Sequence, residues 1–523
     1  MISGVAMDRR TFLLSTGALG LQGAVWQAGD TAHLLPTVND RRILLKASFR
    51  RKVEQPVLQA GKKTVAGRPT DTQGFFWSFD VDGLAPNESY TLQLHDAKKK
   101  ALCDPWPLKT FPTPAASPDK FRLLIYTCAG GDERLRTAAG VSNFLPLATR
   151  QRLFDRALTF SPDAIVGNGD HIYWDLRQTG APPAYPEDIL ASTGRYVRTL
   201  PVMGTDNENV LKRVTEQQVG KLYGTRFRST PVFFLQDDHD YFENDDANER
   251  MVTFPPDHFM LQLGRGTRSL YFPEFLPDAE RPLGLPGASA PDKPAGVGES
   301  FGTIRYGNLA EVALFDCRRY LSLAGPNGWV VPPEVEAWLK ARAADTRVGH
   351  FVNLSSMPPV FSAGKWGDWY PDILGPDGRL TTKVEKPYYQ SGWLKQHDRL
   401  MQALSSMRGR VPIWISGDMH AHGEARLLRG GELDFKQNPV NVFLSGALGT
   451  GNGWPSGGRR TKPYPSQTIE VEERLPALEE NGFLIADFTP DKISIRFFKW
   501  LPKEGLEAID KLQPFRVTEL KRS

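Results

Sequence analysis

The chain has little of three things: cysteine, long apolar runs and an excess of one charge. Its three cysteines allow one disulfide at most, and an exported protein could pair Cys103 with Cys317 and leave Cys128 over. Beyond the N-terminus no segment is apolar for long enough to span a bilayer, so we expect no stable membrane insertion. Lysine and arginine number 64 against 60 acidic residues and are scattered, which disfavours a nucleic-acid partner.

Two adjacent arginines, Arg9 and Arg10, precede a short stretch rich in Gly and Ala that ends near Val25. This order resembles a twin-arginine export signal, and an amphipathic helix or a membrane anchor is the alternative. We therefore expect a signal peptide over residues 1–30, the twin-arginine export machinery as a partner, and a periplasmic or secreted product. Cleavage after Ala24 and cleavage after Ala28 both remain open.

Residues 36–115 alternate apolar and polar side chains as strands do. Leu84, Pro86 and Tyr90 form a Leu-x-Pro-x-x-x-Tyr turn into one of these strands, which resembles fibronectin type III β-sandwiches. We expect an N-terminal β-sandwich domain that packs against or positions the rest of the chain.

From residue 119 to residue 500, apolar runs alternate with helix-like runs, which predicts an α/β core with a sheet covered by helices. A helical insertion near 176–230 and an irregular stretch near 253–300 interrupt this order. Long insertions of this kind are often lids or binding loops. Residues 501–523 are expected to form a C-terminal tail.

Four short segments of the core carry the residues suited to chemistry, and each follows an apolar run that reads as a buried strand. Ligands at the carboxyl ends of several strands of one sheet converge on one place. Taken singly, each segment also has an ordinary structural interpretation, such as a buried thiol, a turn or a helix cap. Together they predict a multinuclear metal site with the ligands Cys128, Asp170, Tyr173, Asp238, Asp418 and His420.

The donor types indicate which metals fit. The thiolate of Cys128 and the phenolate of Tyr173, with His420, suit a strongly Lewis-acidic transition metal, and Fe³⁺ is the expected ion. Asp238 and Asp418 offer only oxygen, which suits Ca²⁺, Mn²⁺ or Mg²⁺. Asp170 is expected to bridge the two ions.

The order of these segments resembles the calcineurin-like metallophosphoesterases, and most closely their alkaline phosphatase D-like branch. The shared motifs are Thr-Cys at 127–128, Gly-Asp-x-x-Tyr at 169–173, Asp-Asp-His at 237–239 and Gly-Asp-x-His at 417–420. The chain departs from the pattern at Asp240, where Glu is usual. It also lacks the histidine that other superfamily members carry in the block corresponding to 353–358.

The resemblance implies a four-layer α-β-β-α sandwich core and an exported, metal-dependent phosphoesterase, expected to be a monomer. Its substrates would be phosphate monoesters, diesters or both, hydrolysed by a metal-bound water or hydroxide. His239 would stabilise the transition state or protonate the leaving alkoxide. Arg318 would hold a phosphate oxygen, or form a structural ion pair with an aspartate.

Two other functions remain open at this point. One is a secreted binding protein in which the metals only hold the fold together. The other is a phosphodiesterase or phospholipase-type enzyme with a narrow choice of substrate. A histidine beside the ligand Asp238 disfavours the first, because a closed structural site leaves no open coordination position.

Replacing Arg9 and Arg10 by lysine tests the export signal. We expect the precursor to accumulate in the cytoplasm, because the export receptor reads both guanidinium groups. Cell fractionation and immunoblotting measure this, with Arg41→Lys/Arg42→Lys as a control pair inside the mature chain. Normal export of the Arg9/Arg10 variant would show that the twin-arginine assignment is wrong.

Overall fold

The computed structural model describes residues 25–135, 142, 144–174, 187–241, 254–288, 293–362, 372–384, 389–451 and 464–522. The two arginines of the expected export signal lie outside these residues, so that expectation stays a prediction. Among the helices that are described, none has both the length and the apolar character needed to cross a membrane.

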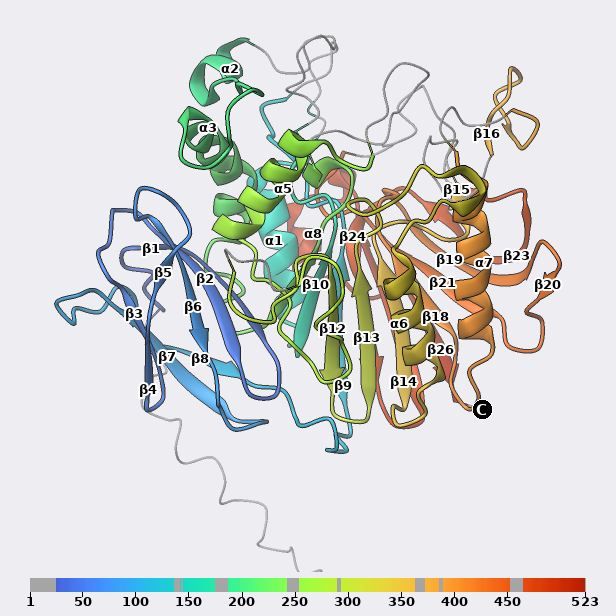
Figure 1. The fold of residues 1–523 in the computed structure, drawn as a ribbon, viewed down its shortest axis with the longest axis horizontal. Helices are drawn as coiled ribbons and strands as arrows, with labels where there is room; N and C mark the ends of the chain where they lie inside the picture. The colour runs from blue at the N-terminus through green and yellow to red at the C-terminus, as the bar shows by residue number, and fades with distance from the viewer. Residues whose placement is uncertain are drawn as a thin grey trace, which may run out of the picture.

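The first eight strands form two facing four-stranded sheets, drawn in blue in Figure 1. One sheet has the order β1 (Thr31–Val38), β2 (Ile43–Phe49), β6 (Phe76–Val81) and β5 (Arg68–Pro69). The other has the order β4 (Lys63–Ala66), β3 (Val57–Ala60), β7 (Ser89–His95) and β8 (Trp106–Lys109). At the turn noted in the sequence, the hydroxyl of Tyr90 accepts a hydrogen bond of 2.7 Å from the backbone N–H of Ala85.

The rest of the chain is built on two larger sheets. The six-stranded sheet has the order β11 (Val232–Leu235), β10 (Ala164–Asn168), β9 (Phe121–Tyr126), β24 (Asn481–Phe488), β25 (Lys492–Trp500) and β26 (Arg516–Lys521). Strands β9, β10 and β11 are parallel, and the last three are antiparallel. The segment expected as a C-terminal tail thus contains an edge strand of this sheet, preceded by helix α8 (Leu506–Ile509).

The eight-stranded sheet begins with β12 (Phe301–Tyr306), β13 (Ala310–Phe315), β14 (His350–Ser355) and β18 (Ile413–Ser416). It continues with β21 (Val440–Ser445), β19 (His422–Gly430) and β20 (Leu433–Asp434), and β23 (Ile469–Leu478) pairs with β19. Strands β13, β14, β18 and β21 are parallel. Both sheets therefore have a parallel centre, whose strand ends meet at one edge.

Alternate residues of the central strands face opposite layers, as the two-residue period of a strand requires. Leu123 and Ile125 of β9 share a core with Val312 and Leu314 of β13, between the two sheets. The residues next to them in β9 pack on helix α1 (Leu147–Leu158), and those next to them in β13 pack on helices α6 (Pro333–Ala344) and α7 (Ser391–Ser405). The layers are helix, sheet, sheet and helix, which confirms the predicted fold class (Figure 1).

The remaining α-helices lie in the two predicted insertions, and several short elements lie elsewhere. The first is helical, as expected, and holds α2 (Glu187–Thr193), α3 (Asp206–Thr215), a π-helical turn η2 (Glu216–Gly220) and α4 (Lys221–Tyr223). The second contains α5 (His258–Leu270), which the sequence did not predict. Smaller elements are β15 (Phe361–Ser362), β16 (Ile373–Leu374), β17 (Leu380–Thr381), β22 (Tyr464–Pro465), η3 (His239–Tyr241), η4 (Gly325–Asn327) and η5 (Pro502–Glu504).

A buried cluster of charges joins the N-terminal sandwich to the core. Glu274 pairs with Lys46 of β2 at 3.0 Å and with Lys293 at 3.1 Å, and Lys46 and Glu274 are fully buried. Burial lowers the pKa of Lys46 to about 8, and although burial alone would raise the pKa of Glu274, the two lysines lower it to about 2. Because a buried charge without its partner is costly, this cluster fixes the sandwich against the second insertion.

All three cysteines are buried free thiols. Cys103 lies in the N-terminal sandwich, whereas Cys317 follows β13 in the core. The pairing of Cys103 with Cys317 that the sequence left open is therefore not formed.

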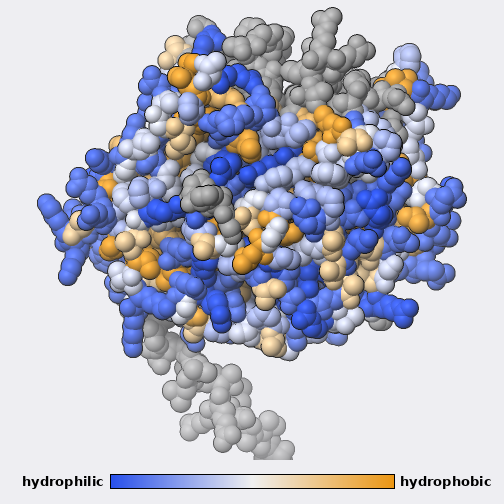
Figure 2. Space-filling model, viewed as in Figure 1, coloured by the Kyte–Doolittle hydropathy of each residue, from blue (hydrophilic) through white to orange (hydrophobic). Residues whose placement is uncertain are grey.

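The face of the molecule in Figure 2 is largely hydrophilic, with small and separate apolar areas. Large exposed apolar side chains are few among the described residues and come from distant parts of the chain: Val25, Val197, Leu200, Leu283, Leu323, Val384, Leu506 and Val517. Apolar residues scattered in this way are ordinary for a folded protein surface.

Candidate metal centre

The predicted site residues lie at the carboxyl ends of four parallel strands, taken from both sheets. Cys128 follows β9, Asp170 follows β10, Asp238 follows β11 and Asp418 follows β18. The first three strands belong to the six-stranded sheet and β18 to the eight-stranded sheet. The site thus lies where the two sheets meet, at the edge to which parallel strands of this kind direct their ligands.

Three of these residues have a positive φ angle, which residues other than glycine rarely adopt. The φ angles are +49° at Cys128, +58° at Asp170 and +61° at Asp418. A backbone conformation of this kind costs about 1–3 kcal/mol in free energy, and it persists only where the surrounding structure enforces it. Each strand therefore ends in a sharp left-handed turn, and the three turns aim their side chains at one another.

The glycine before each of two aspartates is required by close packing. A Cβ atom at Gly169 would lie 2.6 Å from the Cβ of Asp237, and one at Gly417 would lie 2.4 Å from the carbonyl oxygen of Asn168. Both distances are shorter than real Cβ contacts. The two Gly-Asp pairs of the sequence thus reflect strand ends that pack directly on one another.

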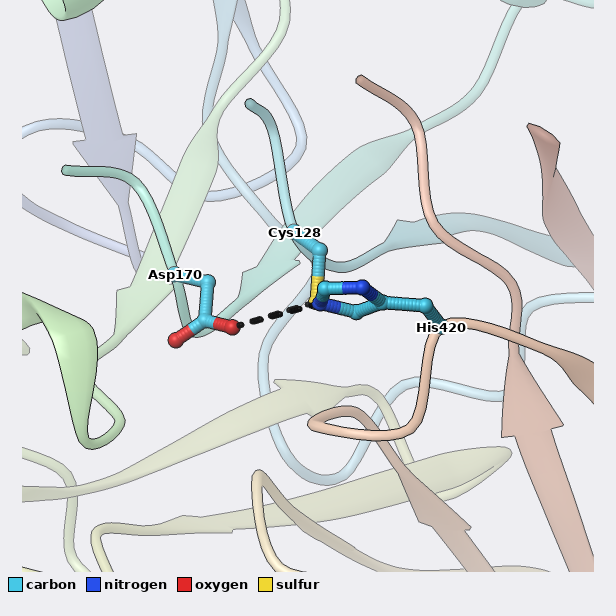
Figure 3. A group of neighbouring side chains, drawn as sticks. All are labelled: Cys128, Asp170 and His420. Atoms are coloured by element: carbon cyan, nitrogen blue, oxygen red, sulfur yellow. Dashed lines mark hydrogen bonds and ion pairs between the residues drawn. The ribbon is translucent and has the colours of Figure 1, made fainter. Parts of the chain in front are cut away.

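One carboxylate oxygen of Asp170 is the centre of the first ligand group. Oδ2 accepts hydrogen bonds from Cys128 Sγ at 3.2 Å and from the hydroxyl of Tyr173 at 3.4 Å, and it lies 3.9 Å from Nε2 of His420. In Figure 3 the thiol and the imidazole overlap on the side of this oxygen, and the ligand atoms of the three residues lie within 4.8 Å of one another. The structure thus brings together all four residues that the sequence assigned to the iron.

The other oxygen of Asp170 points away from this group (Figure 3). Oδ1 is buried and has no hydrogen-bond partner among the residues that the structure describes. Asp170 also lies within ligand distance of Asp238 and His239, since the ligand atoms of these three are within 4.8 Å of one another. Asp170 is therefore placed to serve two groups at once, and His239 is close enough to be a ligand itself.

A third group consists of Asp237, Asp238 and Asp418, whose carboxylate oxygens also lie within 4.8 Å of one another. The sequence analysis assigned metals to Asp238 and Asp418 but not to Asp237. The sequence feature that could have identified Asp237 is its place next to Asp238 in the same acidic segment. An Asp-Asp pair after a strand can direct both carboxylates into the site when the chain turns at once, as it does here in η3.

The guanidinium of Arg318 lies between two of these carboxylates. Its Nε donates a hydrogen bond of 2.6 Å to Asp237, and Nη2 lies 3.7 Å from Asp418. Only 1% of the Arg318 side chain is exposed. Of the two roles considered for Arg318, the structure shows the ion pair with an aspartate, whereas contact with a phosphate oxygen stays a prediction.

The site holds more negative charge than its protein cations can balance. Burial raises the pKa of Asp170 well above its ordinary value, and the charge of Asp238 raises it further. Burial also raises the pKa of Asp237, against the lowering effect of Arg318, and the pKa of the Cys128 thiol. Buried carboxylates this close cannot all be ionised without added positive charge. The crowded acids, the buried and unpartnered Oδ1 of Asp170 and the mixed sulfur, nitrogen and oxygen donors fit bound metal ions.

Asp240 ties the loops of the centre together. Its Oδ2 accepts hydrogen bonds from the backbone N–H groups of Asp170 at 2.8 Å and of Asp237 at 3.0 Å. Its Oδ1 accepts from those of His171 at 2.9 Å and Ile172 at 3.2 Å. Burial raises the pKa of Asp240 to about 7, and the four N–H donors oppose that rise. The shorter side chain at this position thus supports two ligand loops at once.

Other positions support the site without belonging to the three ligand groups. Gln218 of the π-helical turn accepts a hydrogen bond of 2.9 Å from the backbone N–H of Tyr173. His171 lies between the hydroxyl of Tyr223 and the carbonyl of Leu235, and burial lowers its pKa to about 3, so it is a neutral structural residue. Nothing in the sequence pattern distinguished Gln218, because its role depends on how the insertion folds back.

The block over residues 353–358, where the expected histidine is missing, contributes to none of the three ligand groups. It serves packing at the end of β14 instead. The amide of Asn168 donates a hydrogen bond of 3.0 Å to the carbonyl of Ser355, and the indole of Trp414 donates one of 2.9 Å to the hydroxyl of Ser355. Among the described residues, the three ligand groups thus contain no side chain from this block.

Comparison with known proteins identifies the fold. No protein-family model and no curated protein matches the chain in sequence. Among solved structures, PhoD superimposes with a TM-score of 0.60 at 14% identity, over 95% of this chain and 91% of the other. A purple acid phosphatase from yellow lupin (Lupinus luteus) seeds gives a TM-score of 0.55 at 11% identity, over 95% and 75%. The chain thus has the metallophosphoesterase fold that its motifs predicted, including the β-rich N-terminal part.

Truncation of Asp240 tests its supporting role. Asp240→Ala leaves four backbone N–H groups without their acceptor, and each buried donor left unpaired costs about 1–3 kcal/mol. We expect a loss of at least about 3 kcal/mol in the free energy of unfolding, together with reduced metal content, by urea denaturation and elemental analysis. Asp240→Glu, which keeps the carboxylate, should retain the metal. Full metal content in the alanine variant would show that the loops hold their positions without Asp240.

Proposed function

We propose that the protein is an exported phosphoesterase that uses two or more metal ions. The observation that carries this proposal is the placement of Asp170, whose carboxylate belongs to two different groups of metal-ligating side chains. The likeness of the whole fold to solved phosphatases supports it. The N-terminal arginine pair supports export.

The donors divide the centre into two positions. Cys128, Tyr173 and His420 around Oδ2 of Asp170 would hold an electron-poor transition metal, for which Fe³⁺ is our proposal. The carboxylates of Asp237, Asp238 and Asp418 would hold Ca²⁺, Mn²⁺ or Mg²⁺ through oxygen alone. When bound, such ions supply Lewis acidity that lowers the pKa of a coordinated water and neutralises phosphoryl oxygens.

Side chains of the protein would then position the ligands and supply the proton that the reaction needs. Asp170 would contribute a ligand to both metal positions, and Arg318 keeps Asp237 and Asp418 in place while offsetting part of their charge. In the reaction, an oxygen of water forms a bond to phosphorus as the ester P–O bond breaks, and a proton of this water is released to solvent. His239 gives a proton from its ring to the leaving alkoxide oxygen. Its ring lies on that of Tyr173, with a centroid distance of 4.2 Å, which limits how it can turn.

Phosphate monoesters, diesters or both are the proposed substrates. The ligand set is compatible with either, because two positive centres can clamp the nonbridging oxygens of each. We further propose a periplasmic or secreted location and a monomeric protein.

Hydrolysis of p-nitrophenyl phosphate and of bis(p-nitrophenyl) phosphate tests the function. We expect release of nitrophenol from at least one ester, abolished by a chelator and restored by metal. Cys128→Ser should lose iron by elemental analysis and at least about 10–100-fold in activity, the scale found for residues that merely support a metal ligand. Cys103→Ser is the matched control, because Cys103 is a buried free thiol in the sandwich. No hydrolysis of either ester by metal-loaded protein would overturn the proposal.

Substitution of His239 separates a proton donor from a metal ligand. His239→Ala should keep its metal content and lose about 10²–10⁴-fold in turnover on an alkyl phosphate, the usual scale for a general acid. The loss should shrink on an aryl ester, whose phenolate leaves without a proton. Asp238→Ala should instead lose metal and activity together. Metal depletion in His239→Ala would assign His239 to the ligand set, and equal losses on both esters would exclude the role of proton donor.

A further inference from the structure

A cavity of about 640 Å³ lies away from the metal centre, between the N-terminal sandwich and the first insertion. Its lining residues come from β1, β2 and β6 of the sandwich and from α2, α3 and η2 of the insertion, among others. A second cavity of about 400 Å³ shares Ala32, Arg50 and Glu216 with it. The two form one groove along the joint, and a volume of this size suits a small organic molecule.

The floor of the groove is aromatic. Phe75, Phe76 and Tyr271 line the larger cavity, and the rings of Phe76 and Tyr271 meet edge to face with a centroid distance of 5.1 Å. Phe76 and Tyr271 are buried in the fold, whereas Phe75 is half-buried. The half-buried ring of Phe75 is therefore the main aromatic surface that a ligand could contact, because Tyr271 is fully buried and Phe76 nearly so. A ring held in a packed surface binds the apolar body of a ligand at a low cost in side-chain entropy.

The rim of the groove carries the two guanidinium groups of Arg50 and Arg213, and Glu216 is the carboxylate on the same lining. Burial raises the pKa of Glu216, and the nearby charges of Lys221 and Arg50 lower it in part. The Nε of Arg213 donates a hydrogen bond of 2.9 Å to the carbonyl oxygen of Thr193, and Arg50 donates to the carbonyl oxygen of Gly29. Neither guanidinium has a carboxylate within 4.0 Å among the described residues, unlike their neighbour Lys212, which pairs with Asp71 at 2.7 Å. Two guanidinium groups that form no ion pair within 4.0 Å, set against one carboxylate, favour an anionic ligand, which a guanidinium can bind in a fork.

The wall of the groove opposite the sandwich is the π-helical turn η2. Isolated π turns inside helices are uncommon and occur often at functional sites. Glu216 and Gln217 of this turn line the groove, and a Cβ atom at Gly220 would lie 2.2 Å from the Glu216 carboxylate, so the glycine makes room for that side chain. The groove is thus in direct contact with the turn.

The same turn reaches the metal centre from its other side. Gln218 is fully buried, and its amide oxygen accepts a hydrogen bond of 2.9 Å from the backbone N–H of Tyr173. The hydroxyl of Tyr173 in turn donates to Oδ2 of Asp170. A change in the turn that moved Gln218 would therefore change the position of a predicted metal ligand.

We propose that this groove is a binding site for a small organic anion with an aromatic body, and that its occupancy alters metal affinity at Asp170 through Gln218. The site lies outside the catalytic groups and goes beyond the proposed phosphoesterase function. Coupling between the two sites is reciprocal, so a bound metal must change the affinity for the anion by the same factor.

The binding part is tested with 1-naphthalenesulfonate and isothermal titration calorimetry on metal-free protein. We expect a dissociation constant below about 1 mM, and at least about tenfold weaker binding to Arg50→Glu/Arg213→Glu, which corresponds to about 1.4 kcal/mol. Lys62→Glu/Lys503→Glu makes the same change in net charge at exposed positions outside the groove lining and should bind as the wild type does. No binding near 1 mM, or equal binding to both double variants, would overturn the site. This result does not depend on the enzyme's activity.

The coupling part uses Mn²⁺ alone as the second ligand. The affinity of the wild type for Mn²⁺ should change at least about threefold when 1-naphthalenesulfonate saturates the groove, and the affinity for the sulfonate should change equally when Mn²⁺ is bound. Gln218→Met removes both hydrogen-bonding groups at similar volume. This variant should bind the sulfonate as before and show no coupling. An unchanged Mn²⁺ affinity in the wild type, or full coupling in Gln218→Met, would overturn the role of the turn, whereas a failure to bind any metal would instead count against the proposed function.

Discussion

The structure of the centre depends on one buried carboxylate that has two separate tasks. Oδ2 of Asp170 faces a thiol, a phenol and an imidazole, and Oδ1 is buried without a protein partner among the described residues. Burial and nearby acids make the ionised form of Asp170 costly unless positive charge lies close to both oxygens. Metal ions supply that charge more effectively than one arginine can. The crowded ligands are thus stable together only when positive charge is bound among them, which explains their arrangement.

Contacts elsewhere in the fold offset the free-energy cost of holding the carboxylate of Asp170 in place. Left-handed turns at the ends of β9, β10 and β18 would relax if the strand ends were free to move. They are held by glycines that let the loops touch, by the four hydrogen bonds to Asp240, and by the ion pair of Arg318 with Asp237. The facing sheets also bring β18 against β9 and β10. No single sheet would place His420 beside Asp170.

The N-terminal sandwich and the first insertion, which lie outside the two large sheets, are joined to the core by specific contacts. The sandwich is joined to the core through the buried pair of Lys46 with Glu274, and the first insertion reaches Tyr173 through Gln218. The groove between them is lined by residues of both. The first insertion therefore contacts the centre directly through Gln218, whereas the sandwich contacts the two insertions.

The sequence by itself determined the fold class and much of the candidate ligand set, because strand ends, Gly-Asp pairs and donor types are local features of the chain. Cys128, Asp170 and His420 could be named from their places after apolar runs. Only the tertiary structure decided that Asp237 joins the acidic group, that Arg318 lies between two aspartates, that Gln218 supports Tyr173, and that β26 belongs to a sheet. These features depend on contacts between segments far apart in the chain, and a local pattern carries no information about which distant surface a side chain will meet.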